Sequence, residues 1–324
     1  MPLSPSYHVR SLRITECGAE STLVHNSKQF MASLASADLE IGGNEQKVKQ
    51  EYLAIITDAE KERKMIYWVF EALEDEIARL APFSSHEKAS FSVQSYYRPE
   101  AGFIYKLVNK DGYLTPIPLP GDTVKNVDCS GVKISELAES RQNVHLIDTS
   151  KVEIVPSLVP SSDKVKLDGK EYSFKHVRDS HCFDRELGIL QKLVSLGLNK
   201  RLRVPTLCGV VAYSDEQDVI CGILLEPIGS KGWLGTTESE GFSNEQRVKW
   251  MAQIGEVVKQ LHAHGIIWGD VRPENVLIDK TDNAWVTGFG ASESPRFVDG
   301  GMIGTVEGDM QGLAKMRDYL GYLS

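Results

Sequence analysis

The chain has 324 residues, of which 41% are hydrophobic and 25% charged, so its composition matches packed globular proteins and excludes wholesale disorder. Its formal net charge of -9 argues against a nucleic-acid or anionic-membrane surface as the main interaction, because phosphate binding needs clustered Lys and Arg. The length is enough for two domains.

The cysteine content and the N-terminus indicate the cellular environment. The five cysteines are odd in number and form no CxxC pair, which is typical of a reducing compartment without a disulfide framework or a zinc site. The N-terminal "MPLSPSYHVRSLRITE" lacks the apolar core of a signal peptide, and no run of about 18 apolar residues occurs. We therefore expect a cytoplasmic or nuclear protein.

Residues 1–150 form an N-terminal region of α/β character to which the sequence assigns no function. Asn44 to Leu80 is rich in helix formers, contains no Gly or Pro, and has apolar residues at helical spacing. It predicts one long helix, or two with a break near Lys61 to Lys64. Within Ser90 to Leu119, "FSVQSYY", "GFIYKLV" and "YLTPIPL" read as short β-like runs, and "LPGDTVKN" reads as a surface loop.

From about Val152 the pattern predicts a small antiparallel sheet. "KVEIVPSL", "DKVKL" and "EYSFKHV" are strand candidates, and Asp168-Gly169 between the last two is a tight-hairpin signal. A helix is predicted over Ser180 to Ser195, followed by the strands "VPTLCGVVAY" and "ICGILLEPI".

A second helix is predicted to start at a capping box, because Ser243 precedes Gln246 by three positions. It leads directly into "GIIWGDVRPENVLID", in which Asn275 follows Asp270 by five positions and opens the apolar strand "NVLID". The expected apolar face of this helix consists of Val248, Met251, Ile254, Val258 and Leu261.

The order and spacing of these features resemble the protein-kinase-like fold over roughly Val152 to Ser324. The resemblance implies an α+β, two-lobe domain at 151–324, with a small lobe at 151–228 and a truncated large lobe at 229–324. The truncation is expected because fifteen residues follow Asp309 and no "APE" motif occurs.

The resemblance also implies catalytic roles. Lys175 in "YSFKHV" would grip nucleotide phosphates, and Glu186, eleven positions later, would pair with Lys175 and orient it. Asp270 would accept or orient the proton of the substrate hydroxyl.

Further positions match the binding parts of the family. The backbone around Glu226 to Ile228, after a gatekeeper at Leu225, would meet adenine, and Asn275 would hold Mg²⁺. Asp309 in "EGDMQGL" would anchor the catalytic loop structurally. ATP and Mg²⁺ are therefore the cofactors that the resemblance implies.

Three departures change what the family pattern implies. Trp268 and Gly269 replace the usual His and Arg, so we do not expect regulation by activation-loop phosphorylation; the "WGD" resembles small-molecule kinases and atypical fungal kinase-like proteins. Gly288 of "GFG" lies thirteen positions after Asn275, where kinases carry a metal-binding Asp. The segment "VPSLVPSSD" has no glycine where kinases cover the phosphates with a glycine-rich loop.

These departures lead us to expect a degenerate kinase-fold protein, impaired in phosphoryl transfer, that acts as a pseudokinase-type binding or regulatory module. One alternative is an active atypical phosphotransferase on a small molecule. Another is an enzyme that reuses the cleft for acid–base chemistry with Asp270. A fourth is a stabilising partner that uses the N-terminal helices as its contact surface. The sequence leaves open the ligand, the oligomeric state and the role of residues 1–150.

Overall fold

A computed structural model describes residues 7–39, 46–82, 91–121, 131–142, 144–155, 164–177, 179–235, 242–291 and 295–321. The chain divides into two compact units. Unit 1 comprises Met1–Cys129, Asp148–Glu171 and Tyr213–Asp215, and unit 2 comprises Ser130–Ile147, Tyr172–Ala212 and Glu216–Ser324. Among the residues described, no helix is both long and apolar enough to cross a membrane.

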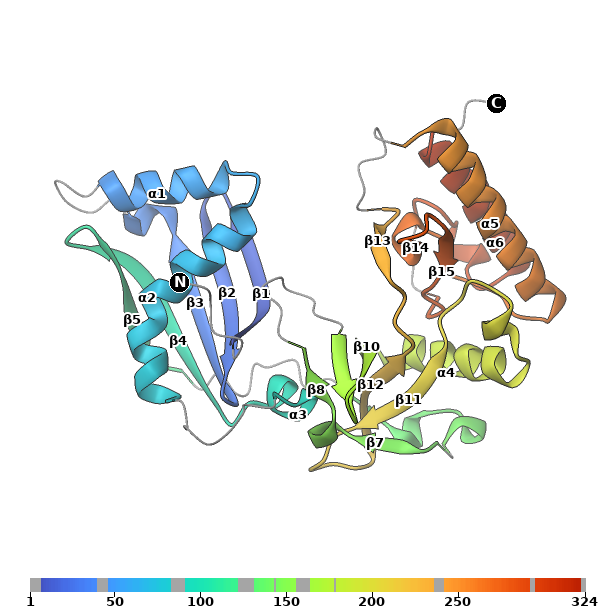
Figure 1. Ribbon diagram of the computed structural model, residues 1–324, viewed down its shortest axis with the longest axis horizontal. Coiled ribbons are helices and arrows are strands. Elements are labelled where there is room, and N and C mark those ends of the chain that lie inside the picture. Colours follow the sequence, from blue (N-terminus) through green and yellow to red (C-terminus); the bar gives the residue numbers. More distant parts are fainter. Residues whose placement is uncertain are drawn as a thin grey trace. The chain divides into compact units, whose positions relative to one another are not determined.

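Unit 1 is built on a five-stranded sheet in the order β1-β2-β3-β4-β5 (Figure 1). Neighbouring strands are antiparallel except β3 and β4, which run parallel, and α1 and α2 form the crossover between them. The strands are β1 (Tyr7–Thr15), β2 (Gly18–His25), β3 (Lys28–Ala35), β4 (Ala101–Lys110) and β5 (Tyr113–Leu119).

The helices α1 (Gln46–Ile56) and α2 (Lys61–Leu80) cover one face of this sheet. The helical pattern therefore forms two helices that break at residues 57–60. Their apolar faces share a core with the strands, in which Tyr52 and Leu73 lie with Leu23 and Phe30. Those faces are turned inward, whereas Leu53 of α1 is 47% exposed.

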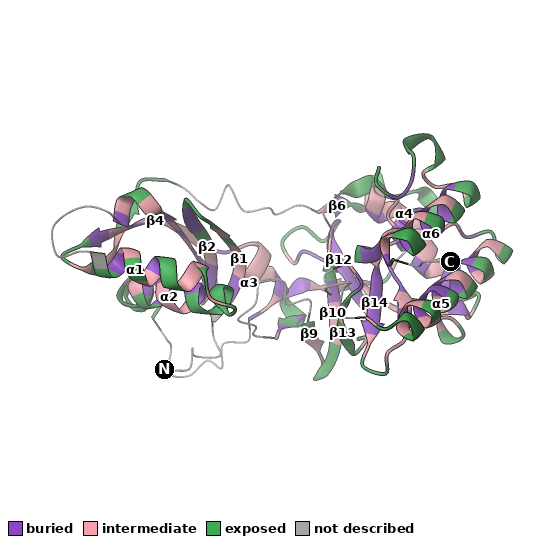
Figure 2. Cartoon of the chain, turned by 90° about the horizontal axis from the view of Figure 1, so that it is seen from above, coloured by how far each residue is buried: buried purple, intermediate pink, exposed green. Residues whose placement is uncertain are grey.

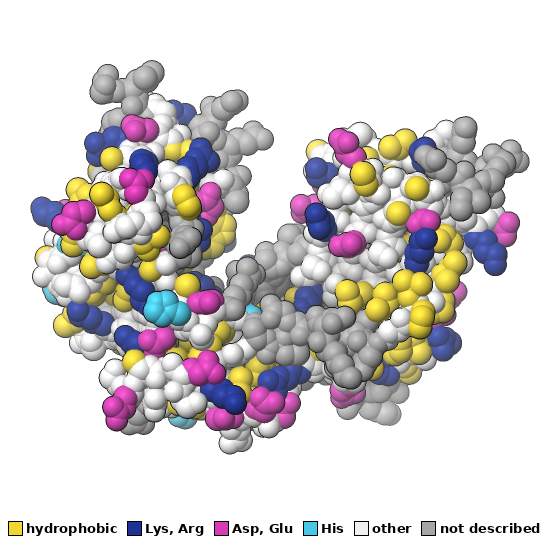
Figure 3. Space-filling view, turned by 180° about the vertical axis from the view of Figure 1, so that it is seen from behind, with side chains coloured by type: hydrophobic (Ala, Val, Ile, Leu, Met, Phe, Trp, Pro, Cys, Tyr) yellow, Lys and Arg dark blue, Asp and Glu magenta, His cyan; other side chains and the backbone are white. Residues whose placement is uncertain are grey.

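The opposite face of the sheet carries exposed apolar side chains on β5. Ile117 and Leu119 are 43% and 40% exposed. Because side chains alternate along a strand, these residues point away from the helices. Figure 3 views the molecule from behind and shows hydrophobic side chains gathered in a band on the unit at the right.

The prediction for "FSVQSYY" was wrong. Residues Val93–Tyr97 form the short helix α3, and the side chain of Ser92 caps it by accepting from the backbone N–H of Ser95. The strands β1, β2 and β3 were not predicted at all. Most of the "LPGDTVKN" loop lies outside the described residues.

Unit 1 also contains a pair of short strands. Strand β8 (Glu153–Ile154) pairs antiparallel with β9 (Lys164–Leu167). Asp168 and Gly169 follow β9 with φ angles of 50° and 77°, as the predicted tight turn requires. The short helix η5 (Thr149–Lys151) precedes β8.

Unit 2 contains the small sheet, in the order β7-β11-β12-β10 with β6 paired to β12. Its strands are β6 (Val132–Lys133), β7 (Leu146–Asp148), β10 (Lys170–His176), β11 (Leu207–Ala212) and β12 (Val219–Leu225). Helix α4 (Ser180–Ser195) follows β10 and ends before η6 (Leu198–Lys200). The short helices η3 (Ile134–Glu136) and η4 (Glu139–Arg141) connect β6 to β7.

The rest of unit 2 combines a three-stranded sheet with two helices. The sheet order is β13-β14-β15, with bounds Ser230–Trp233, Val276–Asp279 and Ala284–Val286. The helices are α5 (Asn244–Ala263) and α6 (Val306–Tyr319), with the short helices η8 (Pro273–Asn275) and η9 (Gly300–Met302). Figure 2 shows the buried strands β12 and β14 within the unit.

Candidate functional site

The pair of Lys175 and Glu186 forms within unit 2. Lys175 lies on β10 opposite Ile223 of β12, and Glu186 lies on α4. Both Glu186 carboxylate oxygens accept from Lys175 Nζ at 2.7 Å. Glu186 is 6% exposed, whereas the Lys175 side chain is 48% exposed. The buried carboxylate thus orients the ammonium, while the lysine side chain stays about half exposed.

Asp270 and Asn275 lie together in the loop between α5 and β14. Asp270 is buried, and its carboxylate forms an ion pair with Arg272 at 3.3 Å. Asn275 Nδ2 donates to the backbone oxygen of Asp270 at 2.9 Å. The backbone oxygen of Asn275 accepts from the N–H and the hydroxyl of Thr287, both at 2.9 Å. The loop is therefore held to the segment that carries Gly288.

Asp309 holds the start of this loop from the first turn of α6. It is 1% exposed and accepts from the backbone N–H groups of Trp268 at 2.8 Å and Gly269 at 2.7 Å. His262 Nε2 lies 2.7 Å from the same carboxylate. This geometry fits the anchoring role expected for Asp309.

Gly288 adopts the left-handed conformation, with φ of 67°. A Cβ atom at this position would overlap the side-chain amide of Asn275. The volume that an Asp side chain would enter is therefore occupied by Asn275. The indole Nε1 of Trp268 donates to the Thr287 carbonyl at 2.7 Å and to the Gly288 carbonyl at 3.2 Å, which fixes this backbone.

The residues around Gly288 do not fit a tightly held Mg²⁺. Mg²⁺ is usually bound through one or two carboxylates in addition to waters and phosphates. Position 288 supplies no carboxylate, and Asn275, whose Nδ2 donates to the Asp270 carbonyl, could offer a metal only its neutral amide oxygen. Within the described ranges, no three His, Cys, Asp or Glu residues are placed to hold a metal ion. Residues 156–163 of "VPSLVPSSD" lie outside the described residues, so the missing glycine cover stays a sequence observation.

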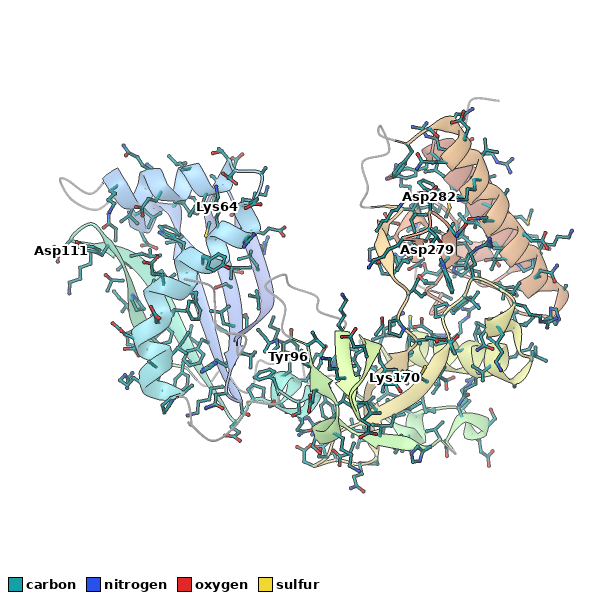
Figure 4. The ribbon with its side chains drawn as sticks, in the orientation of Figure 1. Lys64, Tyr96, Asp111, Lys170, Asp279 and Asp282 are labelled. Carbon is teal, nitrogen blue, oxygen red and sulfur yellow. The ribbon has the colours of Figure 1, made fainter. Side chains whose placement is uncertain are left out.

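The predicted adenine contacts line a cavity of about 400 Å³ that Lys175 and Asp270 do not line. The N–H of Glu226 donates to the Thr206 carbonyl at 3.0 Å. Asp279 also lines this cavity (Figure 4). The lining residues are Asn199, Val204, Thr206, Glu226, Pro227, Ile228, Gly229, Asp279, Lys280, Thr281 and Trp285.

Two residues of the site were missed by the sequence analysis. Arg272 pairs with Asp270 and lies only two positions after it, so its place in "DVRPEN" was a usable signal. Arg185 lies directly before Glu186 and donates to three backbone carbonyls of the loop region, those of Ile267, Trp268 and Phe289. Burial lowers the pKa of Arg185, although nearby Asp309 and Asp270 oppose that shift.

A sheet with one inserted helix, a Lys–Glu pair and an Asp–Asn loop followed by a strand define a protein-kinase-like fold. Residues 162–298 match the family model described as protein kinase domain. The chain is 28% identical over 180 residues to the serine/threonine-protein kinase PKH1 of Saccharomyces cerevisiae, which covers 54% of this chain and 22% of that protein. It is 37% identical over 62 residues to protein kinase 2 of Dictyostelium discoideum, covering 19% of this chain and 13% of that protein.

The chain therefore spans about a fifth or less of the length of these relatives. The matched region includes Lys175, Glu186, Asp270, Asn275 and Gly288, and it ends before Asp309. The fold of this region mixes helices and sheets, which agrees with the α+β class expected from the sequence. The catalytic and binding roles of these residues stay predictions.

Proposed function

We propose that this chain is a kinase-fold binding module in which Mg²⁺-dependent phosphoryl transfer is impaired. The observation that carries the proposal is the left-handed Gly288, whose missing side chain is replaced in space by the amide of Asn275. Phosphoryl transfer relies on positioning and on neutralising charge, and a metal ion without its main carboxylate ligand does this poorly. Each tenfold loss in rate corresponds to about 1.4 kcal/mol.

The Lys175–Glu186 pair supports the proposal that this module still binds nucleotide phosphates. An ammonium oriented by a buried carboxylate attracts phosphate oxygens whether or not a metal is bound. We therefore propose ATP as a ligand that binds with little dependence on Mg²⁺.

Thermal unfolding with ATP, with and without Mg²⁺, tests this proposal. A ligand that binds only the folded state, at a hundredfold excess over its Kd, stabilises by about 2.7 kcal/mol. We expect ATP to raise the Tm of the wild type by a similar amount with and without Mg²⁺, and Lys175→Ala to abolish the rise.

The variant pair Gly288→Asp and Gly288→Asn provides the matched comparison. Both side chains have the same shape, tolerate the left-handed region and must displace the Asn275 amide, but only Asp supplies a carboxylate. We expect Mg²⁺ to increase the ATP shift in Gly288→Asp and not in Gly288→Asn. A wild-type ATP shift that requires Mg²⁺ would contradict the proposal.

An active phosphotransferase acting on a small molecule is the second candidate. Its support is that Asp270 forms an ion pair with Arg272 and that Lys175 is paired to Glu186, since phosphoryl transfer needs positioned charged groups. Turnover of ATP that depends on Asp270 would select this candidate. No observation favours acid–base chemistry of another kind, so it is not proposed.

The proposal extends to partners and compartment. We propose that the module binds a small molecule or a protein, and not nucleic acid or a membrane, since the chain carries a net charge of -9. The sequence carries five cysteines and no CxxC pair, and on that basis we propose a cytoplasmic or nuclear setting.

A further inference from the structure

Three consecutive residues of α4 connect the helix to three different parts of unit 2. Successive helical residues point about 100° apart, since a turn contains 3.6 residues. Asp184 contacts the segment 131–142, Arg185 contacts the loop before Asp270, and Glu186 contacts Lys175. The position of α4, and with it the Lys175–Glu186 pair, is thus fixed from two further sides.

Arg185 connects α4 to the loop before Asp270 and to the segment that carries Gly288. Its Nη1 donates to the Trp268 carbonyl at 3.1 Å and to the Phe289 carbonyl, and its Nη2 donates to the Ile267 carbonyl at 2.9 Å. A guanidinium can supply several donors in one rigid plane, which a Lys ammonium cannot reproduce. The N–H of Phe289 in turn donates to Glu186 at 3.4 Å.

Gly269 provides the space that this contact requires. A Cβ atom at position 269 would lie 2.6 Å from Arg185 Nη2, and the residue has φ of 79°. A larger residue here would displace the Arg185 guanidinium. The glycine that departs from the kinase pattern and the arginine of α4 are therefore complementary in space.

The segment 131–142 fixes α4 from its other side. Val132 and Leu137 are buried in the core that also contains Leu187 and Leu190 of α4. The N–H of Ala138 donates to Asp184 Oδ1 at 3.0 Å, and Arg141 forms an ion pair with Asp184. Position 188 is again glycine, and a Cβ atom there would overlap the Arg141 guanidinium. Strand β6 of the same segment pairs with β12.

We propose that Arg185 and the segment 131–142 are built-in positioning elements that hold α4 in its ion-paired arrangement without a phosphorylated loop or a partner protein. Arg185 is a positioning residue, because it acts through the loop and through the adjacent Glu186. The inference goes beyond the proposed function, and it holds whether or not the chain transfers phosphate.

The reactivity of Lys175 towards an amine-acylating reagent reports the position of α4 without any ligand. A lysine held by a buried carboxylate reacts more slowly than an exposed one, so the rate of Lys175 relative to the exposed Lys259 of α5 measures the pair. We expect Arg185→Met and Arg141→Met each to raise this ratio severalfold in the full chain. Glu186→Gln sets the upper limit, and Val194→Ala, at an exposed position of α4, should leave the ratio unchanged.

Amide hydrogen exchange of the same proteins separates a local effect from general destabilisation. In Arg185→Met we expect residues 266–270 and 287–290 to exchange at least tenfold faster, while the middle of α5 stays protected. If Arg185→Met does not fold, Arg185→Lys replaces it, with an expected intermediate ratio.

Two results would overturn the inference. One is an unchanged Lys175 ratio in both the Arg185 and the Arg141 variants. The other is a phosphatase-treated wild type whose Lys175 reacts as fast as in Glu186→Gln, because the pair would then not form without phosphate.

Discussion

Trp268 illustrates how single residues of the loop are fixed by the backbone they contact. Its side chain is fully buried, and its indole N–H bonds to the carbonyls of Thr287 and Gly288. A ligand-binding role for this aromatic ring is therefore not needed to explain its position next to Asp270. Its task is to hold the segment that contains Gly288.

Replacing Trp268 by Phe keeps an aromatic ring but removes the N–H donor. A buried carbonyl left without its donor costs about 1–3 kcal/mol, so we expect unit 2 to lose roughly that much stability. Urea unfolding of wild type and Trp268→Phe measures the difference, with Trp233→Phe, at a partly exposed position, as the control. Equal midpoints for wild type and Trp268→Phe would refute the structural role.

The sequence predicted some of these residues and not others, for a physical reason. Asp270, Asn275 and Gly288 lie within one short stretch with characteristic spacing, so their relation was readable. Arg185 contacts carbonyls that lie 82 to 104 positions away along the chain. Those partners are backbone atoms, which leave no residue-type signal, so only the folded structure reveals the contact.

At the scale of elements, the sequence predicted the start of helix α5 correctly and its buried face in most positions. The capping box of Ser243 and Gln246 forms as expected. Four residues of the predicted apolar face are buried as expected, namely Met251, Ile254, Val258 and Leu261. Val248 is instead 41% exposed, and the face also includes the buried Trp250 and Val257. The neighbouring sheet decides this, since the Trp250 indole donates to the Asp282 carbonyl.

Ser243→Ala should therefore destabilise unit 2 by about 1 kcal/mol, the typical cost of losing an N-cap side chain. Val248→Ala on the same helix serves as the control and should change stability by less than about 0.5 kcal/mol. Chemical denaturation of the two variants provides the comparison. A larger loss in Val248→Ala than in Ser243→Ala would show that Val248 belongs to the buried face after all.

The elements of unit 1 were harder to predict because packing overrides local preference. "FSVQSYY" is rich in residues that favour strands, yet the Ser92 cap turns it into α3. The strands β1, β2 and β3 carry Ser, Thr, Glu and Arg on one face and were not predicted. These strands are defined by their pairing with one another over many residues. The pattern of apolar and polar residues along the sequence does not show this pairing.

At the scale of the whole molecule, the two units should respond differently to acid. His8 in unit 1 is 2% exposed and stacks on Phe91 at 4.3 Å between ring centroids. Burial and, to a lesser degree, His25 lower the pKa of His8 from 6.5 to about 4. Folded His8 thus stays neutral where the unfolded chain would bind a proton.

The stability that neutral His8 contributes is complete above pH 6.5 and is lost as the pH falls from 6.5 towards 4. We expect unit 1 to lose up to about 3 kcal/mol over this window. Hydrogen exchange of residues 7–25, corrected for the intrinsic pH dependence, follows the loss. His8→Gln should flatten the profile, whereas the exposed His181→Gln should not. A wild-type profile that is flat between pH 6.5 and 4 would rule out the effect.

The central claim, impaired Mg²⁺-dependent phosphoryl transfer, is tested most directly by ATP turnover of the purified chain with Mg²⁺, comparing wild type with Asp270→Asn. The absence of a carboxylate at position 288 predicts turnover at background level in both proteins, with no difference between them. Turnover by the wild type that clearly exceeds background and disappears in Asp270→Asn would contradict the claim and identify the chain as an active phosphotransferase.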